Sequence, residues 1–489
     1  MHYIKIFIME EKYKLPNGWE EKRLDDLFKE FTEKNHADKN ILASTQDRGV
    51  IPSDLLDRHI IRKKESLSNY KLVKKGCFVI SLRSFQGGFE YSNYEGIISP
   101  AYTILEPKIK LRDDFYKYYF KSYYFINKSL PKYAEGIRDG KQIKYKACKE
   151  ILVPYPPLDE QKRIASALSK IDAYLENTIK LIEEKERFKR GIAKKLLTCK
   201  EGENIPEARF KGFEDEWEIV KLGDICLINN KSLKENTDKD YKFKYIDLTA
   251  VKKGIINFSN DYTTFENAPI SARRIINKND IIMATVRPYL LGHAFIDFEA
   301  KDYICSKGFA VLTANSNIEM KYIYQYLYSD DMAKQIKSRL VGSTYPTIRL
   351  SDIKELKIKI PKSIKEQEKI GGYLSLLDEE IDNLKKQKEL IKEMKRVAMQ
   401  KLLSGEVRLS KNAFNENLYQ GRIVNYIGSK ITLSSFLKES IKETLKEIVS
   451  ILDKSFESAD NMLKYVEDSL DKAELLKRAL LRDAFNGNI

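Results

Sequence analysis

The chain has 489 residues, of which 42% are hydrophobic, so it is long enough for about three structural units, each with its own core. Its 87 lysines and arginines exceed its 72 aspartates and glutamates, and the net charge of +15 favours a polyanionic partner such as nucleic acid, although a lysine-rich surface also serves solubility alone. Five dispersed cysteines exclude a disulfide framework or a Cys/His zinc site and are typical of reduced thiols in a cytoplasmic protein.

The N-terminal residues contain a short apolar run that Lys5 interrupts. The run is too short for the apolar region of a signal peptide or for a membrane span, so we expect no membrane association. Met1 and Met9 suit a translation start equally well, and a start at Met9 would remove most of the run.

Residues 1–158 are predicted to form a first globular domain, which opens on GWEEKRLDDLF at residues 18–28. GCFVISLRSF, at residues 76–85, indicates a buried strand that ends in arginine and an aromatic residue. Two polar loops follow, SLRSFQGGFEYS and RDGKQIKYK, and both display side chains of the types that bind base edges in a major groove. The candidate DNA contacts of this domain are Arg83, Ser84, Gln86, Arg138, Lys141, Gln142 and Lys144.

A long helix is predicted over residues 159–198, directly after the prolines of VPYPP. Asp159 and Glu160 complement the positive end of its dipole. Apolar residues recur at intervals of three and four, as in a coiled coil. A helix of this length measures about 55 Å and cannot bury such a stripe alone. The expected interface residues are Ile164, Leu168, Ile171 and Leu175.

Residues 199–364 are predicted to form a second globular domain that repeats the landmarks of the first. Its opener, EWEIVKLGDIC, contains the second of the two tryptophans of the chain, and DIIMATVRPY at residues 280–289 parallels the earlier buried strand. Loop positions comparable to those of the first domain supply the candidate DNA contacts Arg287, Tyr289, Lys307, Thr344 and Tyr345. Because the two domains differ at these loops, they are expected to contact different bases.

A second long helix is predicted over residues 365–406, and it repeats the first without a gap. Of 42 aligned positions, 14 are identical, among them the Glu-Gln pair at the start and KLL at the end. Its expected interface residues are Ile370, Leu374, Leu377 and Ile381. The two helices are obvious partners for each other, and the alternative is a coil that joins two chains. Residues 407–489 are predicted to be a helical extension.

No catalytic motif is evident. The four histidines are isolated, and no Walker A, GxSxG or GxGxxG sequence stands at a strand–helix junction. The sequence therefore predicts no catalytic residue, no metal ligand and no cofactor bound by the chain itself. Lysines elsewhere would contact phosphates, which position a protein on DNA without specifying a sequence.

The paired segments VPYPPLDEQKRIASALSKIDAYLENTI and IKIPKSIKEQEKIGGYLSLLDEEI resemble the helical regions of the specificity subunit of type I restriction-modification systems. GFEYSNYEGIISPAYTIL, GIRDGKQIKY and the two openers resemble parts of its target-recognition domains. The resemblance covers roughly residues 15–410. It implies an α+β fold with two globular α/β target-recognition domains, separated by two long helices that pair as an antiparallel coiled coil.

The resemblance also implies a function. Such subunits bind a bipartite site on double-stranded DNA, one half-site per domain, and are not themselves catalytic. They scaffold modification subunits, which bring S-adenosylmethionine and methylate adenine, and a restriction subunit, which translocates and cleaves DNA. In this picture the paired helices set the spacer between the half-sites.

Two alternatives remain at this point. One is a structural coiled-coil scaffold that does not bind DNA, which would leave the positive charge without a purpose. The other is the recognition part of a fused restriction–methylation enzyme, although two domains and two helices leave no room for a cofactor domain of ~250 residues. The family usually ends near LLSGEVRL, so the extension after residue 406 bears on the quaternary arrangement rather than on DNA binding.

Overall fold

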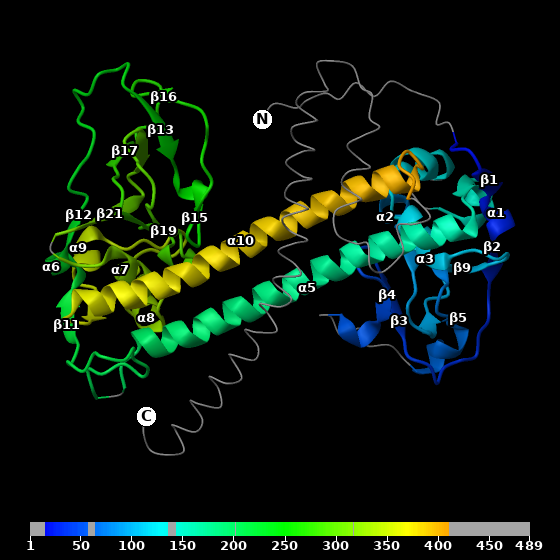
Figure 1. Cartoon of the computed structure of the whole chain (residues 1–489), viewed down its shortest axis with the longest axis horizontal. Coiled ribbons are helices and arrows are strands. Elements are labelled where there is room, and N and C mark those ends of the chain that lie inside the picture. Colours follow the sequence, from blue (N-terminus) through cyan, green and yellow to red (C-terminus); the bar gives the residue numbers. More distant parts are fainter. Residues whose placement is uncertain (1–14, 57–63, 135–142, 201, 316, 410–489) are drawn as a thin grey trace. The chain divides into compact units, whose positions relative to one another are not determined.

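The structure, a computed structural model, describes residues 15–56, 64–134, 143–200, 202–315 and 317–409 (Figure 1). The chain divides into two compact units: unit 1 comprises Met1–Tyr174 and Ile391–Ile489, and unit 2 comprises Leu175–Leu390. The long helices α5, Leu158–Leu197, and α10, Ile364–Leu403, each contribute residues to both units. The predicted α+β class, with two globular parts and two long helices, is confirmed. The predicted C-terminal extension lies outside the described residues, apart from its first three.

The globular part of unit 1 contains short strands and helices in mixed order. They are β1 Glu20–Arg23, α1 Leu24–Leu27, β2 Phe28–Phe31, β3 Leu42–Thr45, β4 Gly49–Pro52, β5 Lys71–Val73, β6 Phe78–Ile80, α2 Ser84–Gly87, β7 Glu90–Tyr91, β8 Gly96–Ile98, β9 Thr103–Pro107, α3 Asp113–Tyr119, α4 Tyr145–Cys148 and β10 Leu152–Tyr155.

The globular part of unit 2 has a similar succession of elements, with additional short strands and an additional helix. Its elements are β11 Glu218–Lys221, α6 Leu222–Ile225, β12 Cys226–Ile228, β13 Lys242–Ile246, β14 Val251–Lys252, β15 Ile255–Ile256, β16 Thr263–Thr264, β17 Ala272–Ile275, β18 Ile281–Ala284, β19 His293–Phe295, β20 Tyr303–Ser306, β21 Phe309–Ala314, α7 Met320–Leu327, α8 Asp330–Ser338, α9 Leu350–Lys354 and β22 Lys357–Ile360.

The two globular parts share one sheet topology. The main antiparallel sheet has the order β2-β9-β6-β7 in unit 1 and β12-β21-β18-β19 in unit 2. In each part the opening strand pairs with the strand that leads into the next long helix, β1 with β10 and β11 with β22. The internal repeat read from the sequence therefore extends through the globular parts, where few side chains are shared.

The Glu-Gln pair at the start of each long helix has a structural reason. Gln161 is fully buried, and its amide accepts a hydrogen bond from the backbone nitrogen of Arg112 at 2.8 Å and donates to the carbonyl of Pro156 at 2.7 Å. Gln367 accepts from the nitrogen of Glu319 at 3.0 Å and donates to Pro361 at 2.8 Å. Each glutamine thus joins the helix start to the residue that precedes α3 or α7.

The glutamate of each pair is also buried and binds an arginine. In unit 2, Arg209 Nε and Nη2 donate to the two carboxylate oxygens of Glu366 at 2.8 Å each. In unit 1, Arg408 makes the same bidentate contact with Glu160. Each arginine follows the end of one long helix, and each glutamate begins the other, so these ion pairs join the two helices at one end within each unit. The side chains of Glu366 and Glu160 are 1% and 2% exposed.

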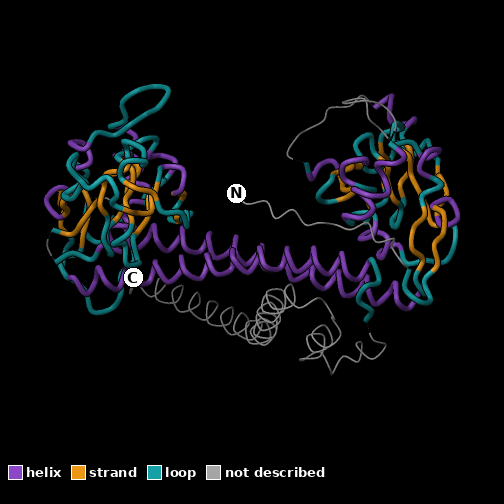
Figure 2. Tube along the Cα trace, turned by 90° about the horizontal axis from the view of Figure 1, so that it is seen from above, coloured by secondary structure: helices purple, strands orange, loops and turns teal. Residues whose placement is uncertain are grey.

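The two long helices run antiparallel within each unit, and they lie side by side there in both views (Figures 1 and 2). In unit 2, Glu186 pairs with Lys385, and Lys189, three residues later on α5, pairs with Asp378, which lies earlier on α10. Residue numbers thus increase along α5 while those of the partners on α10 decrease, as they do in antiparallel helices. In unit 1, Lys395 contacts Asp172.

Among the helices of the described residues, none combines the length and the apolar composition that a membrane span needs.

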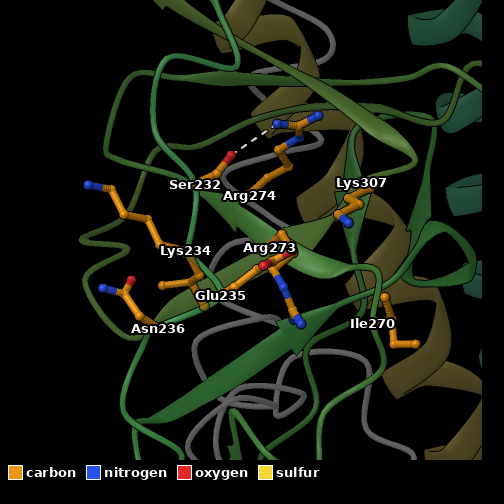
Figure 3. Close-up of a pocket in the computed structure, with 9 residues that line it drawn as sticks. Ser232, Lys234, Glu235, Asn236, Ile270, Arg273, Arg274 and Lys307 are labelled. Carbon is orange, nitrogen blue, oxygen red and sulfur yellow. Dashed lines mark hydrogen bonds between the residues drawn. The ribbon is translucent and has the colours of Figure 1, made fainter.

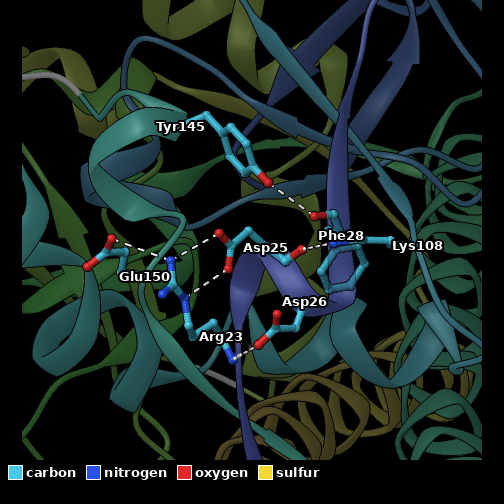
Figure 4. Close-up of polar contacts among 7 residues, drawn as sticks. All are labelled: Arg23, Asp25, Asp26, Phe28, Lys108, Tyr145 and Glu150. Atoms are coloured by element: carbon cyan, nitrogen blue, oxygen red, sulfur yellow. Dashed lines mark hydrogen bonds and ion pairs between the residues drawn. The ribbon is translucent and has the colours of Figure 1, made fainter.

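The opener of unit 1 is held by polar contacts around Arg23 (Figure 4). Its guanidinium donates to both oxygens of Asp25 at 3.1 Å and to Glu150 at 3.4 Å. Nearby, Tyr145 Oη donates to the carbonyl of Phe28 at 3.1 Å. These bonds attach α1 and β2 to the segment around α4, so the charged residues of the opener have a structural role.

Candidate nucleic-acid interface

The candidate contacts Arg287, Thr344 and Tyr345 come together in unit 2. Arg287 is the third residue after β18, and its guanidinium lies 4.5 Å from the centre of the Tyr345 ring. Arg287 Nη2 donates to the carbonyl of Thr344 at 3.2 Å. The Tyr345 side chain is 64% exposed, so the pair lies at the surface. The stacked ring and the carbonyl restrict the guanidinium while leaving other N–H groups for a ligand.

The backbone fixes this pair in place. Arg287 N donates to the carbonyl of Pro346 at 2.7 Å, and Ile348 N donates to that of Thr285 at 2.9 Å. Arg287 has φ +47°, in the left-handed region that non-glycine residues seldom adopt. Such backbone strain persists only where surrounding bonds hold it and is common at functional sites. Tyr289, also a candidate, is half-exposed in the single helical turn that follows.

Lys307 lies at the same end of the sheet. It stands in the turn between β20 and β21, where Phe309 pairs with Ala284 at the end of β18. Thr285 N donates to the carbonyl of Gly308 at 2.8 Å, which ties this turn to the segment that carries Arg287. Two loops that are far apart in the sequence therefore meet at one edge of unit 2.

A basic pocket of about 560 Å³ adjoins Lys307 (Figure 3). Its lining includes Lys234, Arg273 and Arg274, which the sequence interpretation did not identify as candidates. The arginines belong to β17, whose first residue, Ala272, pairs with Ser306, next to Lys307. The sequence could have identified at least one of the two arginines as a surface cation, because adjacent residues of a strand point to opposite faces and cannot both face a core.

In unit 1, Arg83 and Gln86 are exposed after β6. Arg83 is the residue before the short helix α2, as Arg287 is the residue before the helical turn that follows β18, and Gln86 lies within α2. Ser84 differs from them. Its side chain is buried, and its hydroxyl oxygen accepts a hydrogen bond from the backbone nitrogen of Ser81 at 2.8 Å. Ser84 therefore shapes the turn instead of presenting its hydroxyl to solvent.

Lys121 joins α2 to the turn between β3 and β4. Its ammonium donates to the carbonyl of Gly87 at 2.8 Å and to that of Gln46 at 3.1 Å, and it pairs with the buried Glu90. Burial raises the pKa of the Glu90 carboxyl, and Lys121 partly opposes that shift. Gln46 and Arg48 of this turn are exposed and were also missed as candidates. Gln46 lies beside Gly87 of α2, whereas Arg48 donates to the carbonyl of Leu55 at 3.3 Å.

The structure separates Lys144 from Arg83. Lys144 directly precedes α4, and Tyr145 of α4 donates a hydrogen bond to the carbonyl of Phe28. Phe28 pairs with Pro107, the last residue of β9, so Lys144 lies near that end of the sheet. Arg83 follows the other end of the sheet, where Ile80 pairs with Thr103. The length of β9 places these two ends about 13 Å apart. The candidates Arg138, Lys141 and Gln142 lie outside the described residues.

The candidate helix-interface residues also pack against the globular parts. Ile164 and Leu168 are fully buried in the core of unit 1, together with Leu402 and Leu403 of α10, and Ile171 packs against the same core. Ile370, Leu374 and Leu377 belong to the core of unit 2. Ile381 is buried and Leu175 is half-buried. The apolar stripes therefore anchor each long helix in a domain core.

Comparisons with known proteins agree with this architecture. The profile of a family described as the type I restriction modification DNA specificity domain matches residues 16–184 and 214–393. The MjaVIII type I restriction enzyme specificity subunit of Methanocaldococcus jannaschii is 26% identical over 432 residues, which cover 84% of this chain and 99% of that protein. The putative MjaX specificity subunit of the same organism is 25% identical, with 82% and 98% covered.

A solved structure supports the fold. The crystal structure of the type I restriction-modification system S subunit from M. genitalium matches with a TM-score of 0.51 at 20% identity, and the match covers 80% of this chain and 97% of that one. The two family matches each span a globular part and more than half of the long helix that follows it, in keeping with the internal repeat. Because these matches cover well over half of the chain, the protein belongs to the type I restriction-modification DNA specificity family.

Proposed function

We propose that this chain is the non-catalytic specificity subunit of a type I restriction-modification complex in the cytoplasm. It binds a bipartite site on double-stranded DNA, with one half-site for each globular part. It also scaffolds modification subunits, which supply S-adenosylmethionine and methylate adenine, and a restriction subunit. The observation that carries the proposal is the shared sheet topology, which brings an arginine-bearing segment to the same place in both units, with different neighbouring side chains.

The chemistry of these segments supports sequence-specific binding. An arginine can donate two hydrogen bonds to the O6 and N7 atoms of guanine, and glutamine can bind adenine in a similar way. Unit 1 presents Arg83 and Gln86, whereas unit 2 presents Arg287 beside an aromatic ring. Different side chains on one scaffold favour different half-sites.

The test is a map of adenine methylation in a methylation-free host that expresses this chain with its modification subunit. A bipartite methylated motif that disappears when this chain is omitted supports the proposal. If the complex forms and no motif is methylated, the proposed function is wrong and a scaffold without DNA recognition is favoured. A methylation signal that persists without this chain has the same consequence.

Replacing Arg287 with alanine is expected to weaken binding by about 1–3 kcal/mol through one half-site, because a bidentate contact with guanine would be lost. Competition binding with duplexes that carry either half-site mutated will show which half-site has lost its contribution. Arg287→Lys is the matched control, since it keeps the charge and loses the planar pair of donors. An equal loss on random DNA, rescued by lysine, would instead make Arg287 a phosphate contact.

A further inference from the structure

We infer that the basic pocket between β17 and the β20–β21 turn of unit 2 binds a phosphate group of the DNA backbone beside the half-site. This inference rests on the proposed function and adds to it a contact that positions the DNA without specifying bases. The charged and polar residues considered are Lys234, Glu235, Asn236, Arg273, Arg274 and Lys307, all of which are labelled in Figure 3.

The first argument is the uncompensated charge. Within the described part of the chain, no carboxylate forms an ion pair with Lys234, Arg273, Arg274 or Lys307. Glu235 is the acidic residue among those that line the pocket, so four positive charges face one negative charge there. Elsewhere in unit 2 lysines do pair with carboxylates, for example Lys239 with Glu266 and Lys278 with Glu299. An excess of unpaired cations around a hollow favours an anionic ligand.

The second argument is that the cationic groups are held before any ligand binds. Arg273 stacks its guanidinium 4.3 Å from the centre of the Phe265 ring, and its Nη1 donates to the carbonyl of Ala272 at 2.8 Å. Arg274 Nη1 donates to Ser232 Oγ at 2.9 Å, and its Nε is buried without a partner among the described residues. Restricting these long side chains in advance reduces the entropy lost on binding.

The third argument comes from the backbone around the pocket. Leu233 N donates to the carbonyl of Arg273 at 2.8 Å, and Lys307 N donates to that of Ser271 at 2.7 Å. These bonds attach both neighbouring segments to β17, so basic residues from three segments line one hollow. The pocket is open to solvent, and most of the residues that line it are charged or polar, which suits a phosphate that remains part of a duplex better than an enclosed small molecule.

The fourth argument is that the corresponding strand of unit 1 forms without a residue like Arg273. In unit 1, β5 pairs with β8 in regular register, whereas in unit 2 the register of β17 with β20 shifts between Ala272 and Arg274. Arg273 is the extra residue at this irregularity, so the strand pairing that the two units share does not require it.

The location relates the pocket to base recognition. Lys307 borders the pocket, and the next residue, Gly308, accepts a hydrogen bond from Thr285, two positions before Arg287. A phosphate bound here would hold the duplex next to the Arg287–Tyr345 pair. A backbone contact beside a base contact fixes the register of the protein on its site.

The experiment measures DNA binding by the complex of the full chain with its modification subunit, as a function of salt. Arg273→Gln and Lys307→Gln are each expected to weaken binding on the order of 5-fold, equally for cognate and random duplexes, and to reduce the slope of log K against log salt by about 1. The methylated motif is expected to stay the same. Lys278→Gln removes the same charge from the turn that follows the other end of β17 and is expected to behave as wild type.

A second measurement identifies the phosphate. Cognate duplexes that each carry a single methylphosphonate remove one backbone charge at a time. At one position the substitution should weaken wild-type binding and leave Lys307→Gln unaffected, because the two changes remove the same contact. That result supports the inference even if a variant also loses some stability, since the binding of each protein to the modified duplex is compared with its own binding to the unmodified duplex.

Three outcomes would overturn the inference. Variants with wild-type affinity and salt slope would show that the pocket does not contact DNA. A loss confined to the cognate duplex, or a changed methylated motif, would make these residues base contacts. Absence of DNA binding by the wild-type complex would overturn the proposed function as well, whereas the first two outcomes leave it intact.

Discussion

Replacing Arg209 with alanine is expected to lower the free energy of unfolding of unit 2 by about 3–5 kcal/mol, because it leaves a buried carboxylate without its partner. Glu366 is 1% exposed, and Arg209 satisfies both of its oxygens. Arg209 Nη2 also donates to the carbonyl of Asp215 at 2.6 Å, so the substitution releases the loop before β11 too. The loss therefore combines an unpaired charge with a detached loop.

The measurement can use the tryptophan of unit 2. Trp217 Nε1 lies 3.4 Å from Glu366 Oε1, and Trp19 is the other tryptophan of the chain. In a Trp19→Phe background, fluorescence during urea unfolding reports on unit 2. Lys221→Ala is the matched control, because Lys221 pairs with Glu355 at 2.8 Å on the exposed surface of unit 2. An exposed pair of this kind contributes little to stability.

The double variant Arg209→Met/Glu366→Gln separates the charge from the packing. It removes both charges and is expected to recover much of the stability that Arg209→Ala loses, since a buried ion pair is often replaceable by neutral groups. A loss of unfolding free energy for Arg209→Ala no larger than that for Lys221→Ala would contradict the assigned role of the buried pair.

Unit 2 is also expected to lose stability as the pH falls from about 6.5 to about 4, by about 3 kcal/mol through His293 alone. His293 is fully buried on β19, and neither ring nitrogen has a hydrogen-bond partner in the described part of the chain. Burial lowers its pKa from 6.5 to about 4. The unfolded chain binds the proton at a higher pH than the folded chain, so the stability is complete above pH 6.5 and declines below it.

His293→Leu removes the titration and keeps an apolar side chain of similar size. The unfolding free energies of wild type and of this variant can be measured through Trp217 fluorescence from pH 7.5 to pH 4.5. As the pH falls, the unfolding free energy of wild type should therefore decrease relative to that of the variant. Buried carboxyls such as Asp280, whose pKa burial raises, titrate in both proteins and cancel in the difference. His36→Gln, which alters a histidine paired with Glu33 in unit 1, should leave the Trp217 transition unchanged. A difference between wild type and His293→Leu that does not vary with pH would show that His293 is solvated in the folded chain.

Local patterns explain why the helices and the repeat could be predicted. The Pro-capped Glu-Gln starts and the three–four spacing of apolar residues depend on neighbours along the chain, and they predicted helices whose observed bounds are Leu158–Leu197 and Ile364–Leu403. The purpose of the Glu-Gln pair was not predictable. Gln161 and Glu160 bind Arg112 and Arg408, which lie far away in the sequence, and only folding brings them together.

The same distinction applies to the candidate interface. Arginines at strand ends were visible in the sequence, which sufficed to select Arg83 and Arg287. Tertiary structure decided that Ser84 faces inward, that Lys144 and Arg83 occupy opposite ends of a sheet, and that Lys307 shares a pocket with Arg273 and Lys234. The chain by itself thus determined two similar domains, two long helices and a basic character, because these follow from composition and local periodicity. Which basic side chains converge was decided by strand pairing between distant segments, since each strand end meets neighbours that no local pattern specifies.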